Sequence, residues 1–183
     1  MSELRVNRII PRDGLPAGAS GGGIIQCVQT VYKGTTAITT NLGGFTAISD
    51  FNTQITPSSQ SSKILVRLNM YIGDYYYQYK GNLLRDGTSV AGAKGTTQSN
   101  RPGCWFNRIR YGSTGAASSY NMSHIAAEYI DSPGTTSQIT YSIEIGGYSN
   151  TYPIYINRSN AFQDTAGYDY IPISTLTLFE ISG

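Results

Sequence analysis

The chain has 183 residues, a net charge of +2 and only 13% charged residues, so it is long enough for one substantial hydrophobic core. This charge is too small to require a nucleic acid or an anionic membrane as a partner, and no apolar run approaches the ~20 residues of a membrane-spanning helix. No charged segment leads into an apolar run at the start, so we expect no secretion signal and synthesis in a cytosol.

Residues 1–22 differ in composition from the rest of the chain. Apolar residues mix with basic and amide residues, and then prolines and a glycine-rich run follow. Such a peptide cannot fold alone, so it is either a disordered terminus or an arm whose apolar side chains bind a sheet edge or groove of another protein. The candidate partner-binding residues of this arm are Leu4, Val6, Ile9 and Ile10.

The clearest secondary-structure signal lies between Ile64 and Ile72, where every second residue is apolar. Arg67 and Asn69 occupy alternate positions, which is the period of a strand with one face toward water. Pro57 and the small polar residues before Lys63 predict a loop that leads into this strand. We expect this strand at the centre of a sheet, and the rest of the chain repeats the same pattern of short strand and polar turn.

The other expected strands are separated by turn residues and by no helical pattern. Asp86-Gly87 predicts a hairpin, Gly146-Gly147 predicts a turn, and the last strand is apolar on both faces, so it is either central or covered by another subunit. Roughly eight to ten such strands predict an all-β fold, an antiparallel β-sandwich of jelly-roll type with an extended N-terminal arm. Residues 1–22 form the arm and its linker, and residues 23–183 form the sandwich. The main strands are expected at Ile24 to Tyr32, Phe45 to Ile55, Cys104 to Tyr111, Tyr120 to Ile130, Gln138 to Ile145 and Ile171 to Ile181.

The residues that carry enzymatic or metal chemistry are sparse. His124 is the only histidine, and Ser123 points to the opposite face of the strand, so no nucleophile and base are paired. Cys27 and Cys104 lack metal-ligand spacing and are interpreted as buried free thiols rather than a disulfide. Asp164 and Asp169 are interpreted as turn carboxylates rather than cation ligands. We therefore predict a protein that is not an enzyme and has no cofactor or metal.

Aromatic residues offer a different kind of site. Tyr75, Tyr76, Tyr77 and Trp105 are the candidate contacts for a sugar ring, because such side chains combine flat apolar area with a polar edge. The same tyrosine pattern is typical of a sandwich core or a subunit interface, and we favour that interpretation. The basic residues Arg101, Arg108 and Arg110 are interpreted as a solvated strand face.

Several segments together resemble small virion structural proteins of marine tailed bacteriophages, and the resemblance covers most of the chain in order. No part of the resemblance includes the tyrosine-rich segment from Asp74 to Lys80 or the Cys104-Trp105 pair. The segments that carry it are Leu4 to Pro11 with the glycine run up to Gln26, Ile55 to Val66, Tyr129 to Ser137 with Thr140-Tyr141, Tyr155 to Ser159 and Ile173 to Ile181.

The resemblance implies a non-enzymatic particle component, a fibre, knob or decoration protein anchored by its N-terminal arm. It further implies a homotrimer whose arm docks on other virion proteins, located in the virion after synthesis in the host cytoplasm. A carbohydrate-binding, lectin-like module that recognises host surface glycans is the alternative, and a knob with a role in host attachment would combine the two. The sequence leaves open the position on the head, tail or fibre tip, and the oligomeric state.

Overall fold

The computed structural model describes residues 23–40, 43–73, 78–108, 119–147, 151–164, 167 and 169–183. Within these residues the fold is all-β, with one short 3-10 helix, η1 (Ala91–Ala93), and no helix long and apolar enough to cross a membrane. The strands are β1 (Ile24–Tyr32), β2 (Thr36–Ile38), β3 (Thr46–Ile55), β4 (Lys63–Gly73), β5 (Tyr79–Arg85), β6 (Thr88–Ser89), β7 (Phe106–Arg108), β8 (Met122–Asp131), β9 (Ile139–Gly147), β10 (Ile154–Ile156) and β11 (Ser174–Ile181).

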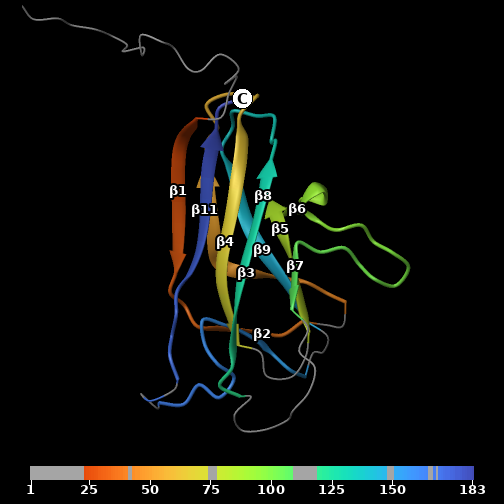
Figure 1. Cartoon of the computed structure of the whole chain (residues 1–183), viewed down its shortest axis with the longest axis vertical. Coiled ribbons are helices and arrows are strands. Elements are labelled where there is room, and N and C mark those ends of the chain that lie inside the picture. Colours follow the sequence, from red (N-terminus) through yellow and green to blue (C-terminus); the bar gives the residue numbers. More distant parts are fainter. Residues whose placement is uncertain are drawn as a thin grey trace, which may run out of the picture.

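The strands form two antiparallel sheets (Figure 1). Sheet A has the order β1-β11-β4-β10-β2, and β8 pairs with the other side of β4. Sheet B has the order β3-β9-β5-β6, and β7 also pairs with β5. The expectation that the strand after residue 63 is central is confirmed, because β4 pairs with β8, β10 and β11.

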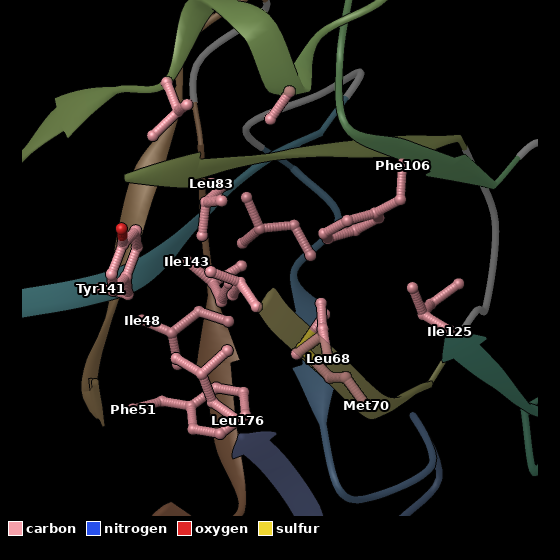
Figure 2. Close-up of a cluster of buried hydrophobic side chains, with 14 of the residues drawn as sticks. Ile48, Phe51, Leu68, Met70, Leu83, Phe106, Ile125, Tyr141, Ile143 and Leu176 are labelled. Carbon is pink, nitrogen blue, oxygen red and sulfur yellow. The ribbon is translucent and has the colours of Figure 1, made fainter. Parts of the chain in front are cut away.

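The hydrophobic core lies between the two sheets. The alternate residues of β4 that the sequence marks as apolar are all buried, and from sheet A Leu68, Met70 and Leu176 face side chains of sheet B such as Phe51 and Ile143 (Figure 2). All of these side chains are fully shielded from solvent. Because the period of a strand is two, one face of each sheet enters this core and the other faces outward.

The closing strand has the expected central place. β11 lies between β1 and β4 in sheet A, and its inward side chains Leu176 and Leu178 are fully buried. Its outward side chains Phe179 and Ile181 stay partly exposed, since no described element covers the outer face of sheet A.

Two expectations were wrong. Gly146-Gly147 is not a turn, because β9 continues through both residues and pairs with Lys80 and Tyr79 of β5. The glycines are needed for close packing, since a Cβ on Gly146 would lie 2.4 Å from the carbonyl oxygen of Gly44. Cys27 is free as expected but exposed, because it faces outward on the edge strand β1.

Candidate functional site

The structure describes only some of the residues that we expect to bind a partner or a ligand. The arm residues Leu4, Val6, Ile9 and Ile10 and the tyrosines Tyr75, Tyr76 and Tyr77 lie outside the described residues. Trp105 is described, and it lies between the long loop after η1 and the start of β7. Two surfaces of the described part can carry a function, and they are a groove beside Trp105 and the outer face of sheet A.

Trp105 is partly buried and is held from two sides. Its ring packs against the hydrophobic core near Phe106, with ring centroids 6.1 Å apart. Its Nε1–H donates to the carbonyl oxygen of Glu128 in β8 at 3.3 Å. The indole also lines a shallow groove of about 350 Å³ with Gln98, Arg101 and Asn107, which we call the Trp105 groove. Trp105 thus has a structural role and also borders a surface depression.

The loop that forms this groove is internally hydrogen-bonded. It projects from the side of the sandwich between η1 and β7 (Figure 1). Gln98 and Arg101 exchange backbone hydrogen bonds of 3.0 and 2.9 Å, the Gly95 N–H donates to the Cys104 carbonyl oxygen, and the Gly103 N–H donates to the Thr97 hydroxyl at 3.1 Å. A loop closed in this way presents its side chains in a defined arrangement without help from a partner.

A second, larger depression of about 590 Å³ adjoins the first, and we call it the Lys80 groove. The two grooves share Arg101, Pro102, Cys104 and Asn107. Its lining includes Lys80 of β5 and the Gly146-Gly147 pair of β9. The two glycines have no side chains to fill the space. The remaining wall residues are Gly43, Gln78, Tyr79 and Asn100.

Lys80 has a fixed position in this groove. Its ammonium group lies 4.9 Å from the centroid of the Phe45 ring, which is a favourable cation–π distance. Burial raises the pKa of the nearby Cys104 thiol, and the positive charge of Lys80 acts in the opposite direction. Lys80 and Arg101 are the charged residues among the described lining of the two grooves, and no carboxylate is found in that lining.

The outer face of sheet A is the second candidate surface. The strand register places one apolar row across its four long strands, made of Cys27, Phe179, Leu65 and Ile130. Ile130 is 50% exposed. Further apolar residues with exposed side chains are Ile24, Ile25 and Val31 of β1, and Ile171 and Ile173, which precede β11.

Two pairs of polar side chains on this face bind each other. Gln29 Nε2 donates to Thr177 Oγ1 at 2.7 Å, and Arg67 Nε lies 2.5 Å from Glu128 Oε1. The face therefore has apolar contact area and two polar pairs that would keep their partners if another surface covered it.

His124 lies at the end of this face and not in a catalytic arrangement. Its exposed ring stacks on Tyr71, with centroids 4.9 Å apart, and Ser123 is paired with the inward-facing Ile72, so the two side chains point to opposite faces as expected. Within the described residues, no group of three His, Cys, Asp or Glu residues is placed to hold a metal ion. Asp169 is a turn carboxylate, because it accepts hydrogen bonds from the Ser159 hydroxyl and the Gln163 N–H.

Three buried polar residues lie in segments that carry the resemblance, and each binds another part of the same chain. Asp131 accepts from Arg85 at 2.7 Å and from the Tyr141 hydroxyl at 2.6 Å, which joins the two sheets. Burial and the hydrogen bond to Asp131 both raise the pKa of Tyr141. Burial acts to lower the pKa of Arg85, but the interaction with Asp131 outweighs it, so that pKa is also raised.

The other two are Asn157 and Glu180. Asn157 Nδ2 donates to the carbonyl oxygens of Tyr32 and Gly34, and its Oδ1 accepts from Ser174. The Glu180 carboxylate accepts from the hydroxyl and the N–H of Ser58, both at 2.6 Å. Burial acts to raise the pKa of Glu180, but these hydrogen bonds outweigh it, so the pKa lies below its usual value. In the segments that carry the resemblance, these three residues therefore stabilise the fold, and their hydrogen bonds are all to other parts of the same chain.

Sequence reasoning identified Trp105 but missed most of the groove. Lys80 and Gln78 stand next to the expected tyrosine platform and were not considered, and Arg101 was interpreted as part of a strand face. The available signal was the long polar loop with Arg101-Pro102-Gly103, together with the paired glycines of β9. Chain order could not show that these segments meet.

Comparison with protein-family models finds no match for this chain, and comparison with curated proteins finds none either. The function is therefore argued from the two surfaces and the sequence resemblance alone.

Proposed function

We propose that this chain is a non-enzymatic structural protein of a bacteriophage particle, displayed as a fibre, knob or decoration component. In this proposal residues 1–22 are an arm that binds other virion proteins, residues 23–183 are the displayed domain, and the protein is made in the host cytoplasm and located in the virion. The sandwich is of jelly-roll type and assembles as a homotrimer.

The outer face of sheet A carries the proposal. A monomer leaves the row of Cys27, Phe179, Leu65 and Ile130 in water across the width of the sheet. An apolar row rimmed by mutually satisfied polar side chains is typical of subunit interfaces. Closed cyclic assembly would cover this row once in each copy.

The sheet orders support the jelly-roll assignment. A jelly roll has eight strands, usually lettered B to I in chain order, in two sheets. In this protein β1, β3, β4 and β5 correspond to B, C, D and E, and the short strands β6 and β7 together correspond to F. The strands β8, β9 and β11 correspond to G, H and I. With these letters the sheets have the orders B-I-D-G and C-H-E-F. This is the strand order of two Greek keys wound together, and jelly rolls are frequent in viral capsid domains.

The test is the mass of the purified full-length protein, measured by light scattering on a sizing column. The proposal expects three times the chain mass of 19.8 kDa. A monomeric mass at all concentrations would contradict the subunit-interface role of sheet A and leave a tethered decoration or sugar-binding module as the better interpretation.

The arm has its own test. Deletion of residues 1–10 removes Leu4, Val6, Ile9 and Ile10 and should leave the displayed domain folded, because these residues precede β1. We expect the truncated protein to keep its circular dichroism spectrum but to be absent from purified particles. Equal incorporation of the truncated and full-length proteins would contradict the arm assignment.

A second candidate function is recognition of host surface glycans, and the two adjoining grooves favour it. They present Trp105, amide side chains and two cations beside each other, which suits a polar ligand with flat apolar faces. The two functions are compatible in a displayed knob. We propose no catalytic role for either surface.

A further inference from the structure

We propose that the Lys80 groove and the Trp105 groove together bind an acidic saccharide, with its carboxylate or sulfate group beside Lys80 and Arg101. The inference rests on the second candidate function, glycan recognition, and specifies the chemical class of the glycan. It concerns side chains that no part of the sequence resemblance explains.

The described lining of the two grooves is positively charged. Lys80 and Arg101 line the same groove, and the described lining of both grooves holds no aspartate or glutamate. Glu144, on the same face of sheet B, lies two residues along β9 from Gly146, outside the lining, and its Oε1 accepts a hydrogen bond from Asn82 at 2.8 Å. Two cations without a carboxylate among the described wall residues favour an anionic group at this place.

The two grooves are also lined by neutral amide side chains. Gln78, Asn100 and Asn107 line the Lys80 groove, and Gln98 is added in the Trp105 groove. Each amide can donate and accept, which matches the hydroxyl groups of a sugar better than it matches an isolated anion. Trp105 borders the same space and offers an apolar surface for a pyranose ring.

The site exists before the ligand arrives. The backbone bonds between Gln98 and Arg101 hold the loop closed, and the Phe45 ring holds Lys80. A ligand would therefore order few side chains, which reduces the entropy cost of binding. Nucleic acid fits less well, because the described lining of the grooves holds only two cations and the net charge of the chain is +2.

The test uses the full chain and isothermal titration calorimetry with four probes. These are hexagalacturonate, its methyl ester as the neutral match, a heparin hexasaccharide that supplies sulfate, and a short oligothymidylate. We expect binding of at least one acidic saccharide, with the methyl ester at least about tenfold weaker, since it keeps the rings and loses the charge.

Variants assign the binding to the grooves. Lys80→Gln and Arg101→Gln should each weaken binding about tenfold, and Lys80→Arg should retain it. Lys33→Gln is the matched control, because it makes the same charge change on an exposed residue after β1 that lines neither groove. Thermal unfolding of each variant identifies any that fails to fold, and only folded variants are compared.

Each other outcome would overturn the inference in a distinguishable way. Equal binding of hexagalacturonate and its methyl ester would reject the acidic class and keep glycan recognition. Binding of no saccharide would reject both the inference and the second candidate function. An oligothymidylate that binds more tightly than every saccharide, or equal losses in Lys33→Gln and Lys80→Gln, would reject the site as described.

Discussion

Buried polar side chains join segments of this protein that lie far apart in the chain. Asp131, Asn157 and Glu180 are each shielded from solvent. Each forms a hydrogen bond with a residue far away in the sequence. A buried polar group without partners costs free energy, so each of these residues strongly favours one position of the segment that it bonds. Asn157 adds a backbone constraint, because its φ of 55° lies in the left-handed region that asparagine tolerates better than most residues.

Glu180 supplies a prediction at this scale. Glu180→Gln should lower the free energy of unfolding near neutral pH by about 2 kcal/mol, because the ionised acceptor of two hydrogen bonds becomes neutral. The pKa of Glu180 is lower in the folded chain than usual. Its contribution to stability is therefore complete above its ordinary pKa of about 4.3 and is lost as the pH falls through the lower folded value.

Urea unfolding of both proteins at about pH 7 and about pH 3 measures this effect, and the difference between them should shrink at the lower pH. Glu128→Gln is the control, since its pairing with Arg67 is exposed and should be worth less than about 1 kcal/mol. A difference that stays constant between the two pH values would contradict the role of the Glu180 carboxylate.

The elements of the fold could largely be predicted from the sequence. Strict alternation identified β4 and its buried face, and β1 was expected with the bounds it has. Asp86-Gly87 forms the expected hairpin, with positive φ values of 50° and 76°, because the favoured two-residue turn needs this geometry. These signals are local, and the chain needs no distant contact to express them.

The elements that could not be predicted depend on distant contacts. Gly146-Gly147 has the local composition of a turn but lies in β9, because β5 pairs with it on one side and the segment before β3 packs over it. The grooves likewise need β5, β9 and the loop before β7 to meet. From the sequence, the aromatic residues of the grooves could be singled out for a ligand, Trp105 among them, but not the polar and charged residues beside them.

Gly146 gives a prediction at the scale of elements. Gly146→Ala should destabilise the protein by about 2 kcal/mol, because the added Cβ would lie 2.4 Å from the Gly44 carbonyl oxygen and the backbone must move. Gly95→Ala is the control, since nothing lies within 4 Å of its added Cβ. Chemical unfolding of both variants is the measurement, and equal stability of the two would contradict the packing argument.

At the scale of the whole molecule, the proposed trimer depends on the exposed row on sheet A. Ile130→Asp should convert the proposed trimer into monomers, because a carboxylate would have to be buried in each subunit contact. The folded monomer should tolerate it, since Ile130 is half exposed. Light scattering measures the mass, and Thr88→Asp on the exposed β5–β6 hairpin is the control. An unchanged mass for Ile130→Asp would place the subunit contact elsewhere.

The direction of β4 separates the two ends of the domain. The Ser182 N–H donates to the Gly23 carbonyl oxygen, so residue 23, where the proposed arm joins, lies at the Lys63 end of this strand. Tyr79 and Lys80 follow Gly73 closely in the chain and lie toward the opposite end. The 11 residues of β4 span about 35 Å at the rise of a strand. An arm anchored on a particle would therefore place the Lys80 groove toward the end away from the particle, with the Trp105 groove beside the middle of the sandwich, where Trp105 bonds to Glu128.

A symmetric trimer would point three such grooves in one direction. Host surfaces carry many copies of a glycan, so one trimer can hold several at once. The second and third contacts would then form at a high effective concentration, and avidity can exceed the affinity of one site by about 10² or more. If the proposed function holds, each groove could therefore bind weakly and the trimer would still hold a particle to a cell.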